Sequence, residues 1–69
     1  MTLSHKVRFT TPFKHSHEHL YAWCFANVGA RYITWDREIA HMDYEKGLYL
    51  WVYMFHTAES AAAFAITHA

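Results

Sequence analysis

Hydrophobic and polar positions alternate along the chain in a way that predicts three β-strands. Residues 3–10 alternate strictly between apolar and polar sides, and residues 31–35 are rich in β-branched and aromatic side chains. Residues 48–55 are apolar on both faces, because leucine, valine and methionine alternate with tyrosine, tryptophan and phenylalanine. A strand with two apolar faces belongs in the centre of a sheet.

Two further stretches have the spacing and the end signals of helices. Between Ser16 and Gly29, apolar residues recur at helical spacing, Ser16 is a favourable N-cap, and glycine supplies the C-terminal stop. Thr57 is the N-cap predicted for a second helix, and Glu59 lies in its first turn, where the helix dipole favours a negative charge. Alanines in this second helix allow it to lie close to a sheet.

Residues 36–46 are compatible with two structures. A capped helix closed by Gly47 is one, but its apolar stripe is thin. The other continues the second strand to Met42, turns through residues 43–47 and returns along residues 48–55. We expect the hairpin, and the turn residues favour it.

The predicted order of elements is therefore strand, helix, strand, strand, helix. A right-handed crossover from the first strand to the second, with the third strand inserted between them, gives a three-stranded antiparallel sheet with both helices on one face. This is an α+β fold that resembles a ferredoxin-like fold lacking its last strand. We expect one domain over residues 1–69.

Length and composition limit how such a domain is stabilised and where it works. A chain of 69 residues buries only about 60% of its unfolded surface, and small domains usually need a disulfide, a metal or a partner. The single cysteine excludes an internal disulfide and fits a reducing compartment. No apolar run reaches the roughly 20 residues of a membrane-spanning helix, and the N-terminus lacks a signal peptide's apolar stretch, so we expect a cytoplasmic protein.

One face of the predicted sheet has no helix to cover it. If Val7 and Phe9 face the helices, the basic residues of the first strand lie on the open face, where we expect the aromatic side of the third strand beside them. The residues predicted to form this contact surface are Tyr49, Trp51, Tyr53, Tyr32, Lys6 and Arg8. Tyrosine and tryptophan are typical of interface centres, so we expect a protein partner, a homodimer or both.

The same surface has a second interpretation as a nucleic-acid interface, because RNA-recognition modules stack bases on aromatic strands. The RNP1 pattern is absent from the chain, and six basic residues balance six acidic ones. A neutral chain lacks the electrostatic attraction that phosphate backbones provide, which disfavours nucleic acid as a partner.

Histidines are concentrated before the first predicted helix, where His15, His17 and His19 are separated by single residues. Either an extended or a helical backbone can present two of these imidazoles to one zinc, nickel or copper ion, with Glu18 or Cys24 as a further ligand. The alternative is that they are exposed polar residues, since the spacing matches no structural zinc pattern. A metal-binding module is therefore the second functional hypothesis.

No catalytic arrangement is predicted. Cys24 falls on the apolar stripe of the first helix and is interpreted as a core residue rather than a nucleophile. The acidic pairs Asp36 with Glu38 and Asp43 with Glu45 are interpreted as turn residues, and two glycines do not make a phosphate-binding loop. We therefore expect a protein that is not an enzyme.

The C-terminal part of the chain resembles a loosely defined class of small proteins. An aromatic strand followed by the junction from Phe55 to Phe64 is similar to the tail of small phage-encoded proteins, including ferredoxin-like inhibitors of host defence systems. The resemblance implies an inhibitor or adaptor that occludes a surface on a host protein or sequesters a ligand. It transfers no binding residue to this sequence.

Overall fold

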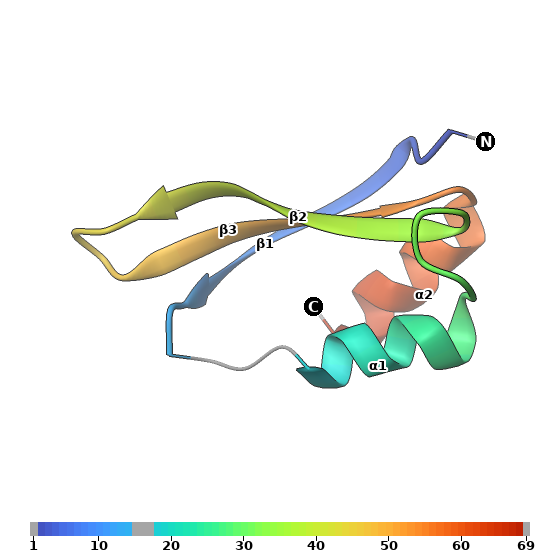
Figure 1. Ribbon diagram of the computed structural model, residues 1–69, viewed down its shortest axis with the longest axis horizontal. Helices are drawn as coiled ribbons and strands as arrows, with labels where there is room; N and C mark the ends of the chain where they lie inside the picture. Colours follow the sequence, from blue (N-terminus) through green and yellow to red (C-terminus); the bar gives the residue numbers. More distant parts are fainter. Residues whose placement is uncertain (1, 15–17, 69) are drawn as a thin grey trace.

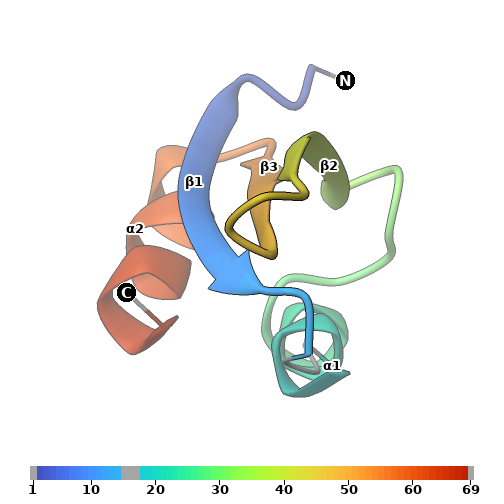
Figure 2. The same ribbon diagram turned by 90° about the vertical axis from the view of Figure 1, so that its left-hand side faces the viewer.

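The computed structural model describes residues 2–14 and 18–68, and they form an α+β fold with the predicted order of elements. The elements are β1 (His5–Pro12), α1 (Glu18–Asn27), β2 (Trp35–Asp43), β3 (Leu48–Phe55) and α2 (Ala58–His68). The three strands form an antiparallel sheet in the order β1-β3-β2, so β3 is central as predicted. Both helices lie on the same side of this sheet (Figures 1 and 2).

The start of α2 and the end of α1 follow the signals in the sequence, whereas the Ser16 N-cap predicted for α1 lies outside the described residues. At the start of α2, the Ser60 backbone N–H donates a hydrogen bond of 3.1 Å to Thr57 Oγ1, which is the predicted N-cap. At the end of α1, the backbone N–H groups of Val28 and Gly29 both donate to the Cys24 carbonyl, at 2.8 and 3.1 Å. Gly29 has a φ of 130°, which residues with a Cβ rarely adopt, so glycine is required where the chain leaves this helix.

The hairpin between β2 and β3 confirms the strand-and-turn prediction for residues 36–47. The strand ends at Asp43, whose Oδ1 accepts a hydrogen bond of 3.2 Å from the Lys46 backbone N–H. Gly47 completes the turn with a φ of 66°. The register shifts between Ile39 and His41, which is a β-bulge in β2.

The second strand begins later than predicted. Residues 31–34 were expected to be part of it, but they form a turn in which Tyr32 has a φ of 70° and Thr34 N–H donates to the Ala30 carbonyl at 3.0 Å. The strand starts at Trp35, whose indole Nε1 donates to the Gly29 carbonyl at 2.9 Å. Tyr32 therefore lies in a loop and not on the sheet.

The register of the sheet decides which residues share a face. Val7 is paired with Tyr53 and Phe9 with Trp51, and directly opposed residues in antiparallel strands point to the same side. Lys6 and Arg8 are paired with Met54 and Val52 on the other side. The prediction that the aromatic side of β3 lies on the open face beside the basic residues is wrong.

The core explains this arrangement. It is formed by residues from both helices and from the aromatic side of the sheet, and its most buried members are Trp35, Tyr53, Phe55, Phe64 and Cys24. The alanine-rich α2 supplies little volume, so large aromatic side chains fill the space between it and the sheet.

Neither helix in residues 2–14 and 18–68 has the length and the apolar character that a membrane-spanning helix needs.

Candidate functional site

The predicted contact residues are divided among three places. Tyr49, Trp51 and Tyr53 lie on the helix side of β3, Lys6 and Arg8 lie on the open side of β1, and Tyr32 lies in the loop before β2. The single aromatic and basic surface expected from the sequence is therefore not formed. The stacking platform proposed for nucleic acid depended on the same arrangement, so the register removes its geometric basis as well.

Tyr53 is a core residue. Its side chain is fully buried, and its ring stacks on Phe64 with the centroids 4.6 Å apart. The hydroxyl accepts a hydrogen bond of 3.1 Å from Arg37 Nη1. Burial raises the pKa of the Tyr53 phenol, although the hydrogen bond and charge of Arg37 oppose this, so the group stays protonated at neutral pH. Tyr53 is not available as a contact residue.

Arg37 carries a charge on the helix-side face of β2, and it is not among the contact residues predicted from the sequence. Its guanidinium carbon lies 4.2 Å from the ring centroid of Tyr21 and 5.1 Å from that of Trp51. Such cation–π contacts, together with the bond to Tyr53, hold a charge beside an aromatic core. Because side chains alternate along a strand, Trp35, Arg37 and Ile39 share one side of β2. A basic residue between two apolar ones on that side is the sequence signal for Arg37.

Tyr32 belongs to a second arginine cluster at the start of β2. The Arg31 guanidinium carbon lies 4.7 Å from the Tyr32 ring centroid, and Arg31 Nε donates to Asp36 Oδ1 at 2.9 Å. Arg31 Nη1 also donates to the Tyr21 hydroxyl at 3.2 Å. These contacts fix the loop against α1 and the sheet edge while the Tyr32 ring stays 71% exposed.

The aromatic residues that extend from the core toward solvent are at the hairpin end of the sheet. We define the distal aromatic cluster as Phe13, Tyr44, Tyr49 and Trp51. Consecutive rings in this cluster are in contact: the centroids are 5.8 Å apart for Tyr44 and Phe13, 4.3 Å for Phe13 and Tyr49, and 6.2 Å for Tyr49 and Trp51. Tyr44 is 75% exposed, whereas Trp51 packs against the core.

The position of the distal aromatic cluster follows from the shape of the fold. The β2–β3 hairpin extends past the beginning of α1, so the helices do not cover its end (Figure 1). Ile39 and Met42 of β2 are paired with Trp51 and Tyr49, and both are more than two-fifths exposed. The hairpin end therefore carries a continuous apolar surface that starts in the core and ends in solvent.

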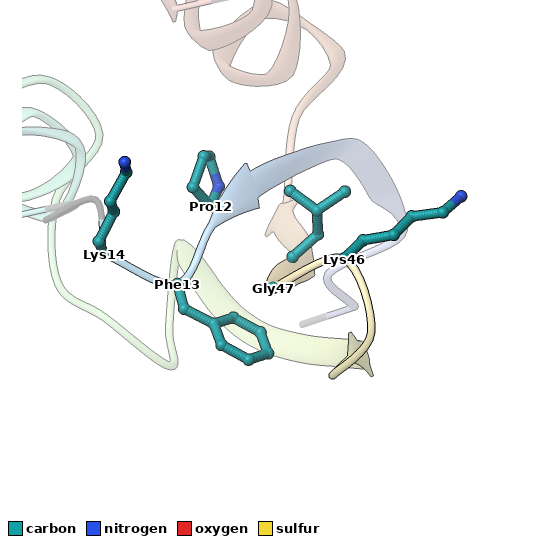
Figure 3. Close-up of a pocket in the computed structure, with 6 residues that line it drawn as sticks. Pro12, Phe13, Lys14, Lys46 and Gly47 are labelled. Carbon is teal, nitrogen blue, oxygen red and sulfur yellow. The ribbon is translucent and has the colours of Figure 1, made fainter.

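Next to the cluster lies an open pocket of about 450 Å³ between the end of β1 and the hairpin turn. Its lining is formed by Pro12, Phe13, Lys14, Lys46, Gly47 and Leu48. The Phe13 backbone N–H donates to the Gly47 carbonyl at 2.8 Å and joins the two segments. Figure 3 shows Lys14 on the β1 side of the pocket and Lys46 on the hairpin side, with the Lys46 side chain directed away from the other lining residues.

The histidine hypothesis rests partly on residues outside the described part of the chain, since His15 and His17 fall there. His19 is exposed on α1, and its ring centroid lies 6.1 Å from that of His68. Among residues 2–14 and 18–68, no group of three or more histidine, cysteine or acidic side chains could hold a metal ion. Burial, and then the proximity of His19, lower the pKa of His68.

Cys24 occupies the core position that the sequence predicted. Its side chain is fully buried, and burial raises the pKa of the thiol to about 12 despite the opposing charge of Arg37. The thiolate is the reactive form of cysteine, so this side chain is inert at neutral pH in the folded protein.

Comparison with known proteins adds no family or fold relative: no family model, no curated protein and no solved structure matches the chain.

Proposed function

We propose that the protein acts by binding, as an inhibitor or adaptor that engages a protein partner through the distal aromatic cluster. The observation that carries this proposal is the continuous series of ring contacts from Trp51, packed against the core, to Tyr44, which is 75% exposed. Aromatic side chains supported in this way lose little conformational freedom on binding and provide a large contact area.

The surroundings of the cluster suggest the chemistry of the partner. Apolar side chains of Ile39 and Met42 extend the surface along β2, while Lys14 and Lys46 flank the adjacent pocket. A partner segment with aromatic or aliphatic residues and nearby carboxylates complements both features. The sequence resemblance implies a host-defence protein, and we include such a protein in the proposal as the partner.

The test compares two truncations of exposed apolar side chains. Peptides from a surface-displayed random library are selected on the immobilised wild-type protein, and the affinity of each selected peptide is then measured for Tyr44→Ala and for Ile66→Ala. Ile66 lies on α2 and is 84% exposed, so its variant is the matched control. We expect Tyr44→Ala to weaken binding about tenfold or more, and the control to leave binding unchanged.

Selection of peptides rich in apolar and acidic residues that depend on Tyr44 would support the proposal. Peptides that bind the two variants equally well would contradict it, because the contact surface would then lie elsewhere. Circular dichroism of both variants establishes that the fold is retained before affinities are compared.

A further inference from the structure

The open face of the sheet has an ordered charge pattern that the aromatic side does not have. Its residues form rows across the three strands, and the register defines two of these rows as Lys6–Met54–Asp36 and Arg8–Val52–Glu38. Each row is basic on β1, apolar on β3 and acidic on β2. Leu50 and Leu48 continue the apolar line along β3 toward the hairpin.

Three of the four charges in these rows form no ion pair with another described residue. Asp36 already accepts a hydrogen bond from Arg31 at 2.9 Å. In contrast, Arg8 and Glu38 are exposed, and no ion pair joins either of them to another residue in the part of the chain that the structure describes. The helices lie on the opposite side of the sheet, so neither covers this face (Figures 1 and 2).

We propose that this face binds a second copy of the chain. Two copies stacked face to face around a two-fold axis parallel to β3 place β1 of each over β2 of the other, at the same height along the strands. Arg8 of one copy then faces Glu38 of its partner, and the symmetry repeats the contact. Between these two charged borders, the partly exposed Met54, Leu50 and Leu48 of β3 pack on their counterparts at the spacing of about 10 Å that stacked sheets adopt, whereas Val52 is already only 4% exposed in the single chain.

The charge pattern selects this arrangement over the other two-fold stacking. An axis perpendicular to the strands would place β1 over β1 and β2 over β2, which brings like charges together. A pattern with basic residues on one border and acidic residues on the other is therefore self-complementary for a single axis only. This is the interface symmetry expected of a homodimer.

The size of the face predicts a weak dimer. A three-stranded face with strands of eight or nine residues covers on the order of 400–500 Å² per copy. Such a pair buries about 800–1,000 Å² in total, which is below the standard size of stable interfaces and typical of weak, transient contacts. We therefore expect a dimer in the micromolar range, and one that leaves the distal aromatic cluster on the opposite side of the sheet free.

Charge reversal tests the inference by sedimentation equilibrium on the full untagged chain. Arg8→Glu and Glu38→Arg should each weaken self-association about tenfold or more, because each creates two like-charge contacts per dimer. Lys46→Glu and Glu45→Arg are matched controls that make the same charge changes in the exposed turn between β2 and β3. Both controls should associate as the wild type does.

Mixing the two open-face variants provides the decisive measurement. In an equimolar mixture of Arg8→Glu and Glu38→Arg, every cross-pair again joins opposite charges, so heterodimers should form where each variant alone is monomeric. The double variant in one chain should also recover the wild-type affinity. Peptide binding that depends on Tyr44 should be unaffected, which separates this inference from the proposed function.

Three outcomes would overturn the dimer. A wild type that remains monomeric up to millimolar concentration excludes it. A dimer that is insensitive to both reversals must use another surface, such as the unpaired edge of β1 or β2. A mixture that associates no better than its components shows that Arg8 and Glu38 do not face each other. Circular dichroism of each variant confirms that the measured chains are folded.

Discussion

The two ends of β3 carry the same kinds of residue but have opposite environments. Tyr53 and Phe55, near the C-terminal end of the strand, are fully buried between the sheet and the helices. Tyr49 lies on the same face near the hairpin and is only partly buried. Its ring contacts that of Phe13, which in turn contacts the exposed Tyr44. Residue type does not distinguish the two ends. They differ because the helices are long enough, and so placed, to cover only one of them.

This difference separates stability from binding within one strand. At the helix-covered end, aromatic side chains fill the space under an alanine-rich helix, and their removal leaves a cavity. At the hairpin end, aromatic side chains of the same kind pack against the protein on one side only, so a partner can contact their other side. A small domain can therefore use a continuous aromatic stripe both as its core and as its candidate binding surface.

The largest expected effect comes from truncating one aromatic residue beside each end of β3, Phe64 on α2 and Tyr44 in the hairpin turn. Phe64 is 1% exposed and its ring contacts Tyr53 and Phe55, so Phe64→Ala should lower the free energy of unfolding by about 3–5 kcal/mol. A domain of this size has about 5 kcal/mol in total, so this variant should keep about 0–2 kcal/mol and be only marginally folded. Tyr44→Ala should change stability by less than about 0.5 kcal/mol.

Urea unfolding followed by far-UV circular dichroism measures both variants against the wild type. Equal destabilisation by the two truncations would contradict the division of β3 into a core end and an exposed end.

A smaller effect is expected from removing one hydroxyl at each end. Tyr53→Phe eliminates the acceptor for the 3.1 Å hydrogen bond from Arg37 and should cost about 1 kcal/mol. Tyr49→Phe removes a hydroxyl near the exposed end and should be nearly neutral. The two midpoints of chemical unfolding, measured side by side, check this. A neutral Tyr53→Phe would show that the ring contacts of Arg37 hold it in place without the hydrogen bond.

The smallest expected effect is a dependence of stability on pH through His68 at the covered end. Burial, and secondarily His19, lower the pKa of folded His68 below its ordinary 6.5. The unfolded chain therefore takes up a proton first as the pH falls. The contribution of the neutral ring is complete above the unfolded pKa and is lost as the pH falls from there toward the folded value.

Replacing His68 with glutamine removes this titration. The thermal midpoint of wild-type protein should fall more than that of His68→Gln between about pH 7.5 and about pH 5.5, with the variant lower at the starting pH because the ring contact with Trp23 is lost. Parallel loss in both proteins would assign the pH dependence to other histidines.

The elements of this fold were accessible from the sequence because their signals are local. The N-cap Thr57, the stop at Gly29 and the turn closed by Gly47 act within a few residues, and each forms the structure predicted for it. The double-sided apolar pattern of residues 48–55 likewise predicted the central strand. The start of β2 was missed because Tyr32 adopts a positive φ, which β-branched and aromatic neighbours do not indicate.

The candidate site was predicted only in part. Tyr49 and Trp51 were singled out, but Phe13 and Tyr44 were not, since they come from a segment after a strand and from a turn. Only the sheet register brings these two segments together, through the bond from Phe13 N–H to the Gly47 carbonyl. Tyr53 was assigned to the surface although it is buried.

By itself, the sequence determined the strands, the helices, their order and the central place of β3, because periodicity and capping are properties of neighbouring residues. It did not determine which apolar side of β3 the helices would cover, since both sides alternate equally well. Tertiary structure decided this by packing volume: the larger aromatic side chains fill the space beneath the alanine-rich α2. The smaller aliphatic ones were left on the open face, between the basic border of β1 and the acidic border of β2.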